Sequence, residues 1–323
     1  MKISNFIRSQ YDRQFELNKL LNNFVDDKIR ELLINHNSWH YISRLKSLES
    51  FALKLETGRG LDEDLNLEDF LGCTIVVENY DSISVAYQLI INTFDLVYQR
   101  PENVDQTVKS PESFIFDELR LYCKLNTEKM RSEVVFSDLI FEIQIKSFLQ
   151  HAWGIATHDL IYKGDTLHWG LARIAYQVKA MLEHAELSIK QANNLIECNE
   201  LNKDFKSINQ LNEILLVVKN HWDVDQLPSD LRRLAENFKK LLEIIEYDID
   251  QFNNLLTENK PPSGHPRNLT PYAATIQYLF KREEQKFIKF LNKRNSRSKF
   301  KVYIDPSIEI PSNIDKSMFV NVV

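Results

Sequence analysis

The stretch that decides the fold is Phe141–Lys163, F-E-I-Q-I-K-S-F-L-Q-H-A-W-G-I-A-T-H-D-L-I-Y-K. It begins with three apolar residues that alternate with three polar ones, Glu142, Gln144 and Lys146. A period of two predicts a strand whose polar side chains share one face, and the later change of spacing toward 3.6 predicts a helix. A carboxylate, an amide and an ammonium in one row suit a binding site, although an edge strand with a solvated face would have the same pattern.

The composition is that of an ordinary globular protein. The 323-residue chain has 43% hydrophobic and 27% charged residues, and this length allows two domains. A net charge of -6 gives no global signature of nucleic-acid binding, so any basic surface must be local. No apolar run reaches the length of about 18 residues that crosses a bilayer, and the N-terminus lacks the apolar core of a signal peptide. We therefore expect a cytoplasmic protein that makes no use of a membrane.

The cysteines and glycines argue against several kinds of site. Cys73, Cys123 and Cys198 are far apart in the sequence and form no C-x2-C pair, which argues against zinc and against a disulfide framework. With seven glycines, the chain contains neither a P-loop nor a dinucleotide-binding glycine motif. If this protein binds phosphates, its side chains must hold them.

A cluster of cations precedes the first predicted strand. Apolar residues at helical spacing predict one helix over residues 39–55, and the other side of that helix would carry Arg44, Lys46, Ser50 and Lys54. Like charges on neighbouring turns repel one another unless an anion lies among them. A polyphosphate would relieve this repulsion, although a solvated helix face would also account for the pattern.

Asp69 lies just before a predicted strand at residues 71–77. A carboxylate beside a cationic helix could hold Mg²⁺ on phosphates, although alone it would indicate only a turn. A helix at 81–94 and strands at 95–99 and 119–125 follow before the opening stretch. This order predicts an α/β (α+β) domain with a mixed sheet flanked by helices and with antiparallel neighbours, unlike a Rossmann sheet.

These motifs resemble the synthetase domain of the RelA/SpoT-homologue family, and in size the chain is similar to the small alarmone synthetases. The family's R-x-K-x3-S-x3-K motif is complete at Arg44–Lys54, and its D-x-x-G follows at Asp69–Gly72. Its E-x-Q-[VI]-[RK] strand is present at Glu142–Lys146, and its H-x-L-x-Y-K motif appears in expanded form around His158. The motifs occur in the family's order over residues 39–163.

The resemblance implies a nucleotidyltransferase-like fold that transfers the β,γ-pyrophosphate of ATP to a nucleotide 3′-hydroxyl, with Mg²⁺ as cofactor. Arg44 would stack on the adenine. Three residues would hold the triphosphate, namely Lys46, Ser50 and Lys54. Asp69 would bind Mg²⁺, and Glu142 would accept the 3′-hydroxyl proton or help to bind the metal.

On the acceptor side, the resemblance implies roles for Gln144, Lys146 and His158. The family's acceptor loop, whose tyrosine stacks on guanine, has no clean counterpart in this chain. The segment 109–120 stands in its place. There Phe116, or its neighbour Phe114, could supply the aromatic face and Arg120 the cation.

Three substitutions distinguish this chain from the family pattern. Thr74 stands where the family has an arginine that completes the adenine sandwich. Lys146 replaces an arginine, which keeps the charge but loses the two-pronged guanidinium. Thr157 replaces the glutamate of an E-H pair.

We assign residues 1–200 to the synthetase domain with its N-terminal helices and residues 201–323 to a mainly helical C-terminal region. Apolar stripes at helical spacing predict helices at 171–185, 211–218, 231–256 and 271–292.

The segment 281–301 is strongly basic. It carries nine basic residues against Glu283 and Glu284, in a chain with a net charge of -6. This asymmetry indicates an RNA or an acidic protein partner. Cations also favour the C-terminal end of a helix dipole, so a solvated helix end accounts for the pattern equally well.

Three functions remain open at this point. The first is an alarmone synthetase that makes a (p)ppGpp-type guanosine 3′-pyrophosphate. The second is the toxic branch of the family, which pyrophosphorylates the 3′ CCA end of tRNA to block translation. The C-terminal helices would then be a regulatory module or the neutralising part of a toxin–antitoxin pair. The third is a catalytically weak nucleotide sensor. The sequence leaves the oligomeric state open, a homo-oligomer included.

Overall fold

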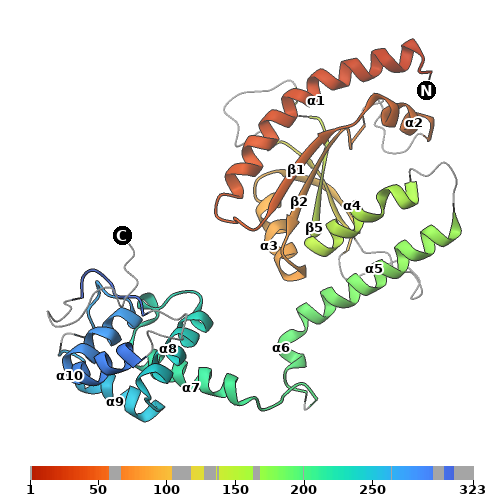
Figure 1. Cartoon of the computed structure of the whole chain (residues 1–323). Coiled ribbons are helices and arrows are strands. Elements are labelled where there is room, and N and C mark those ends of the chain that lie inside the picture. Colours follow the sequence, from red (N-terminus) through yellow and green to blue (C-terminus); the bar gives the residue numbers. More distant parts are fainter. Residues whose placement is uncertain are drawn as a thin grey trace. The chain divides into compact units, whose positions relative to one another are not determined.

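The computed structural model describes residues 2–57, 67–103, 118–126, 136, 138–162, 168–198, 200–262, 264–293 and 302–308. The chain divides into two compact units, unit 1 (Met1–Leu201) and unit 2 (Asn202–Val323). Unit 1 holds a five-stranded sheet with helices, and unit 2 is mainly helical in its described residues (Figure 1). The expected mixed sheet flanked by helices and followed by a mainly helical region is confirmed.

The elements of unit 1 are α1 (Asn5–Leu32), β1 (His40–Leu45), α2 (Leu48–Thr57), β2 (Leu71–Val77), α3 (Tyr80–Ile91), β3 (Asp95–Arg100), β4 (Leu119–Lys124), β5 (Phe141–Ser147), α4 (Phe148–Tyr162), α5 (Trp169–Lys190) and α6 (Ala192–Leu195). The strand order is β1-β2-β5-β4-β3. The pair β2·β5 is parallel, and the other three pairs are antiparallel. Since β5 lies at the centre of the sheet, the interpretation of this stretch as a solvated edge strand is wrong.

The two faces of β5 have different surroundings. Phe141, Ile143 and Ile145 are fully buried in a core that also contains residues of α1 and α3. Glu142, Gln144 and Lys146 alternate with them and therefore lie on the other face. Residues of the neighbouring strands that pair with these three share that side, which we call the polar face of the sheet.

The single helix predicted over residues 39–55 is wrong. Residues 40–45 form strand β1, which pairs antiparallel with β2 along its whole length, and only residues 48–57 are helical. The segment H-Y-I-S-R-L also has a period of two, with alternating exposed and half-buried side chains. Pairing with β2 satisfies the backbone of this short segment and overrides its weak helical spacing.

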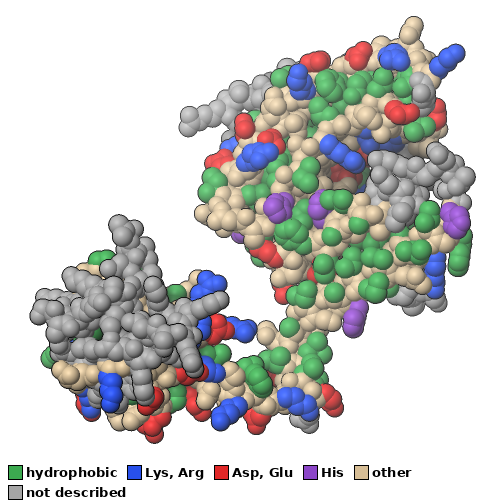
Figure 2. All heavy atoms as spheres, in the orientation of Figure 1, with side chains coloured by type: hydrophobic (Ala, Val, Ile, Leu, Met, Phe, Trp, Pro, Cys, Tyr) green, Lys and Arg blue, Asp and Glu red, His purple; other side chains and the backbone are tan. Residues whose placement is uncertain are grey.

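The apolar stripe predicted over residues 171–185 is only partly buried in α5. Helix α5 packs against α4, and the side chains it buries include Ala175, Lys179 and Glu186. Ile174 and Met181 are exposed instead. Figure 2 shows hydrophobic side chains gathered over α4 and α5.

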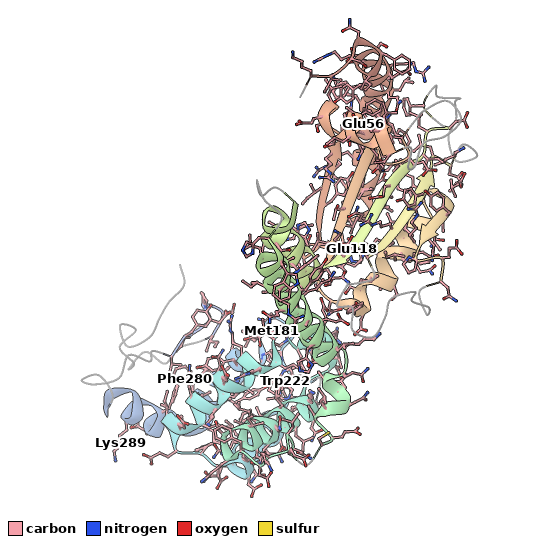
Figure 3. All side chains as sticks on the ribbon, turned by 90° about the vertical axis from the view of Figure 1, so that its right-hand side faces the viewer. Glu56, Glu118, Met181, Trp222, Phe280 and Lys289 are labelled. Carbon is pink, nitrogen blue, oxygen red and sulfur yellow. The ribbon has the colours of Figure 1, made fainter. Side chains whose placement is uncertain are left out.

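Unit 2 consists of α7 (Lys206–His221), the short 3-10 helix η2 (Val224–Gln226), α8 (Leu231–Ile245), α9 (Ile249–Asn259) and α10 (Pro271–Lys293). They enclose a separate hydrophobic core that includes Trp222 and Phe280, both labelled in Figure 3. The one helix expected over 231–256 is two helices. Glu246 has a left-handed backbone (φ 52°) that ends α8, and Asp248 caps α9 through the N–H of Gln251.

In the ranges that the structure describes, no helix combines the length and the apolar character needed to cross a membrane.

Candidate active site

Three of the four residues of the cationic motif line one pocket, and the fourth, Lys54, pairs with the carboxylate of Asp69 in that pocket. Arg44 is on β1, Lys46 is in the turn after it, and Ser50 and Lys54 are on α2. A pocket of about 260 Å³ is lined by Arg44, Lys46, Ser50 and Asp69, with Leu45 and Ser47. Lys54 reaches the same carboxylate as Lys46. The structure thus places all four residues of the motif beside Asp69.

Asp69 is held between two cations. Its Oδ2 accepts hydrogen bonds from Lys46 Nζ at 3.0 Å and from Lys54 Nζ at 2.5 Å. Burial acts to raise the pKa of this carboxyl, but the hydrogen bond from Lys54 and the charge of Lys46 outweigh it, so the pKa lies below its usual value. The carboxylate therefore stays charged and keeps both ammonium groups in place.

Helix α1 fixes the two turns that carry these groups. The side chain of Gln14 accepts a hydrogen bond from the backbone N–H of Leu67 at 3.1 Å, just before Asp69. Tyr11 donates to the carbonyl of Lys46 at 3.0 Å, and the N–H of Lys46 donates to the carbonyl of Phe70 at 2.8 Å. The backbone around Lys46 and Asp69 is thus tied to α1 and to the start of β2.

Gly72 connects this pocket to β5. Its register partners are Arg44 on β1 and Glu142 on β5, so the three positions form one row on the polar face. A Cβ placed on Gly72 would meet no heavy atom of the described residues within 4 Å. As far as the described side chains are concerned, the space between Arg44 and Glu142 at this row is therefore open.

Glu142 is buried, with 5% of its surface exposed, and both of its carboxylate oxygens are hydrogen-bonded. Tyr122 on β4 donates to Oε2 at 2.8 Å, and Gln144 donates to Oε1 through a short hydrogen bond. Its position beside Gly72 makes it a candidate base for a substrate bound over that open space.

The two cations predicted for the acceptor share a second carboxylate. Glu118, labelled in Figure 3, pairs with Lys146 Nζ at 3.1 Å and with Arg120 Nη2 at 2.8 Å. Burial acts to raise the pKa of Glu118, but Lys146 and Arg120 outweigh it, so this pKa also lies below its usual value. Arg120 lies opposite Gln144 in the sheet register.

Two other predicted acceptor residues have no described side chain. Phe116, with its neighbour Phe114, lies outside the described residues. His158 is within α4, but its side chain is outside them as well. Thr74 is next to Gly72 along the polar face of β2, paired with Ile42 and Gln144.

Sequence reasoning did not single out four residues near the site, namely Glu68, Tyr98, Glu118 and Tyr122. A signal existed for two of them. Glu118 and Tyr122 alternate with apolar residues around Arg120, so a strand prediction places them on the same face as that cation. Glu68 lies in the turn before β2, and Tyr98 lies on β3 at the far edge of the sheet. No pattern in the sequence around either residue indicates that the two are in contact.

Asp69 is the better fit of the two predicted metal ligands. Its Oδ1 is buried and has no hydrogen-bond partner among the described residues, whereas both oxygens of Glu142 are engaged. The described residues contain no cluster of three or more His, Cys, Asp or Glu side chains arranged for a metal. Mg²⁺ often binds one or two carboxylates together with substrate phosphates, so the leftover oxygen suits such an ion.

A pocket of about 570 Å³ in unit 2 is larger than the one at Asp69. Among the described residues, its one charged lining residue is Asp225. The described lining therefore offers no cation to a polyphosphate, and the pocket beside Asp69 is the better candidate for a phosphate site.

Residues 43–166 match the family model described as "Region found in RelA / SpoT proteins". This part of the chain is therefore a RelA/SpoT region, and the resemblance drawn from its motifs is confirmed over these residues. The match covers less than half of the chain. A comparison with curated proteins finds no match.

Solved structures that resemble the chain include small alarmone synthetase 1 from Bacillus subtilis, with 14% identity, a TM-score of 0.45 and coverage of 58% of this chain and 98% of that one. Small alarmone synthetase 2 from Bacillus subtilis has 19% identity, a TM-score of 0.45 and coverage of 57% and 98%. A GTP pyrophosphokinase family protein from Streptococcus pneumoniae has 14% identity, a TM-score of 0.44 and coverage of 63% and 100%.

The charge of Asp69 should contribute to stability in a pH-dependent way. We expect Asp69→Asn to lower the free energy of unfolding at about pH 7 by about 1.5–3 kcal/mol, because two lysines lose a charged acceptor. Since the pKa of Asp69 is lowered by folding, its contribution is present above its usual pKa of 3.8 and is lost as the pH falls through the lower folded value. The difference between variant and wild type, measured by urea unfolding, should therefore shrink toward about pH 2.

The matched control is Asp138→Asn, because Asp138 is exposed. It should leave the free energy of unfolding nearly unchanged at both pH values. A destabilisation by Asp69→Asn that is equal at both would contradict the role assigned to its charge.

Proposed function

We propose that this protein is a pyrophosphokinase that transfers the β,γ-pyrophosphate of ATP to the 3′-hydroxyl of a guanosine nucleotide. The observation that carries the proposal is the row Arg44–Gly72–Glu142, which joins a cation-lined pocket to a buried carboxylate across open space. Membership of residues 43–166 in the RelA/SpoT region supports the reaction class. The guanosine acceptor rests on the resemblance to that family.

The donor triphosphate would lie in the pocket of Arg44, Lys46, Ser50 and Asp69. Phosphate oxygens compete for the same N–H donors that Asp69 now holds, so binding would exchange carboxylate for phosphate at Lys46 and Lys54. Arg44 is exposed, and its planar guanidinium can stack on a base. Ser50 Oγ, which accepts from Ser47 Oγ at 3.0 Å, would add a neutral donor.

Mg²⁺ would be held by Asp69 through its unpartnered Oδ1, together with the phosphates. Such an ion would supply neutralisation of charge on the transferred phosphates. Release of the two lysines toward the phosphates would free Oδ2 as well. With the metal ion assigned to Asp69, Glu142 would be available to act on the acceptor hydroxyl.

The reaction forms a bond between the acceptor 3′-oxygen and the β-phosphorus of ATP. It breaks the bond from that phosphorus to the oxygen that bridges the α- and β-phosphorus atoms. AMP leaves with the electron pair, and Glu142 takes the proton of the 3′-hydroxyl. Displacement at phosphorus depends mainly on alignment and charge neutralisation, and the polar face offers both. Lys146 and Arg120 would hold the phosphates of the acceptor.

Glu142→Gln should lower the rate of transfer about 10²- to 10⁴-fold, because the variant lacks the base. Affinity for ATP should stay at the wild-type value, since the donor pocket is lined by other residues. The measurements are initial rates with labelled ATP and calorimetric titration with ATP. Glu49→Gln, an exposed change on α2, is the control, and a wild-type rate for Glu142→Gln would remove this residue from the mechanism.

Gly72→Ala tests whether the reacting groups of the substrates lie over Gly72, between Arg44 and Glu142. The added methyl group meets no atom of the described part of the chain within 4 Å, so the free energy of unfolding should change by less than about 1 kcal/mol. Transfer should nevertheless fall about 10-fold or more, because the methyl group displaces the reacting groups. Gly154→Ala on α4, where a Cβ also meets nothing within 4 Å, is the matched control, and equal rates for both variants would contradict the placement.

A second candidate acceptor is the 3′ end of tRNA. Exposed cations on α10 favour it, including Lys281 and Lys289, the latter labelled in Figure 3. They belong to the basic segment 281–301, most of which lies outside the described side chains. The acceptor loop of the family's guanosine enzymes also lacks a clean match in this sequence.

Incubation with γ-labelled ATP and either GDP, GTP or total tRNA separates these functions. Label in a guanosine nucleotide is the expected result, label in RNA supports the second candidate, and label in neither supports a nucleotide sensor. Reversing the charge of Lys289 and Lys293 to Glu should lower the rate with tRNA only if RNA is the acceptor. Lys219→Glu on α7, an exposed change in the same unit, is the control for the added negative charge.

A further inference from the structure

The carboxylate of Glu142 is aimed by a tyrosine from the neighbouring strand. Tyr122 lies directly opposite Glu142 in the antiparallel β4·β5 register and donates a hydrogen bond to its Oε2 at 2.8 Å. Both side chains are buried, with 5% of each exposed. A hydrogen bond between a phenol and a buried carboxylate is strong and directional, so it restricts the rotamers of Glu142.

Tyr122 is in turn held by Tyr98 on β3. The two rings stack with centroids 4.3 Å apart and an angle of 10° between their planes. The guanidinium of Arg100 lies 5.5 Å from the centre of the Tyr98 ring and 5.3 Å from that of Tyr122. Stacking and the cation together restrict the ring that carries the hydroxyl on Glu142.

A bulge in β3 produces this stack. The register runs from Leu96 opposite Cys123 directly to Tyr98 opposite Tyr122, so Val97 is the extra residue. Without the bulge, Val97 would lie opposite Tyr122, and Tyr98 would face the other side of the sheet. Bulges that redirect a side chain in this way are common near active sites.

The hydroxyl of Tyr98 reaches the turn that carries Asp69. It donates to Glu68 Oε2 at 2.6 Å, and Glu68 immediately precedes Asp69. Burial, and after it Glu68, raises the pKa of Tyr98 to about 12, and burial with Glu142 raises the pKa of Tyr122 as well. Both phenols therefore remain protonated hydrogen-bond donors at neutral pH.

We propose that Tyr122 is a positioning residue that aims Glu142 at the acceptor hydroxyl, and that Tyr98 braces Tyr122 and links it to the turn that carries Asp69. The inference rests on the proposed function, because it assigns Glu142 the proton of the acceptor. It goes beyond that function by making the alignment of the base depend on residues from β3 and β4. Neither tyrosine needs to touch the substrate for this role.

Tyr122→Phe is the direct test, because it removes one hydroxyl and keeps the stacked ring. The kcat should fall about 10- to 100-fold through misalignment of Glu142, while the KM for ATP stays at the wild-type value. Tyr98→Phe should lower kcat in the same direction by a smaller factor, since it breaks only the link to Glu68. Tyr176→Phe on α5, a partly exposed tyrosine of the same unit, is the control and should match wild type.

Measuring the effect of Tyr122→Phe a second time, in a Glu142→Asp variant, shows whether Tyr122 acts through Glu142. In Glu142→Asp the carboxylate is withdrawn by one methylene and loses its contact with Tyr122, so adding Tyr122→Phe should then lower kcat about 3-fold at most. An equal fall in both backgrounds, or a change of KM for ATP as large as that of kcat, would overturn the inference. If Tyr122→Phe lowers the thermal unfolding midpoint so far that its kcat cannot be measured on folded protein, Tyr98→Phe is compared in the wild-type and Glu142→Asp backgrounds instead.

The failure of this inference differs from the failure of the proposed function. A wild-type rate for Glu142→Gln would contradict the function itself. An inactive Glu142→Gln together with a fully active Tyr122→Phe would contradict only the role of the tyrosines.

Discussion

The parallel pairing of β2 with β5 is the constraint on which the candidate site depends. Its register sets Gly72 opposite Glu142, so the turn with Asp69 and the strand with Glu142 share one end of the sheet. A shift by one residue would turn Glu142 toward the core now filled by Phe141, Ile143 and Ile145. Burial of these side chains therefore holds the register, and the register brings the two carboxylates to one end of the polar face.

Both sides of the polar face use the same electrostatic arrangement, in which one carboxylate lies between two cations. Asp69 holds Lys46 and Lys54, and Glu118 holds Lys146 and Arg120. Each group keeps a net positive charge, so each can still attract an anion. Because the long cationic side chains are already ordered, binding a phosphate would cost less conformational entropy than ordering free lysines would.

The residue types of the candidate donor pocket could be predicted from the sequence, since its motif residues are close in the chain. The local structure was predicted less well. Residues 40–45 are a strand because β2 pairs with them along their whole length. The spacing of apolar residues within 39–55 cannot predict this pairing, because β2 lies outside that segment. The helix expected over 231–256 is divided at Glu246 and Asp248 for a local reason, since a left-handed residue and a capping aspartate separate α8 from α9.

The candidate acceptor side depends more on contacts between distant residues. Gln144, Lys146 and Arg120 were predicted, but Glu118, which pairs with both cations, was not. The stack of Tyr98 on Tyr122 requires a bulge in β3, and a bulge depends on how two strands pair rather than on either strand alone.

By itself, the sequence determined the RelA/SpoT region, the chemical types of the candidate donor residues and the alternating faces of β5, because these depend on residue identity and on spacing within one element. Only the tertiary structure decided that β5 is central, that Gly72 lies between Arg44 and Glu142, and that tyrosines from β3 and β4 hold Glu142. The physical reason is that strand order and register are set by burial and hydrogen bonding between segments far apart in the chain, and no single segment records them.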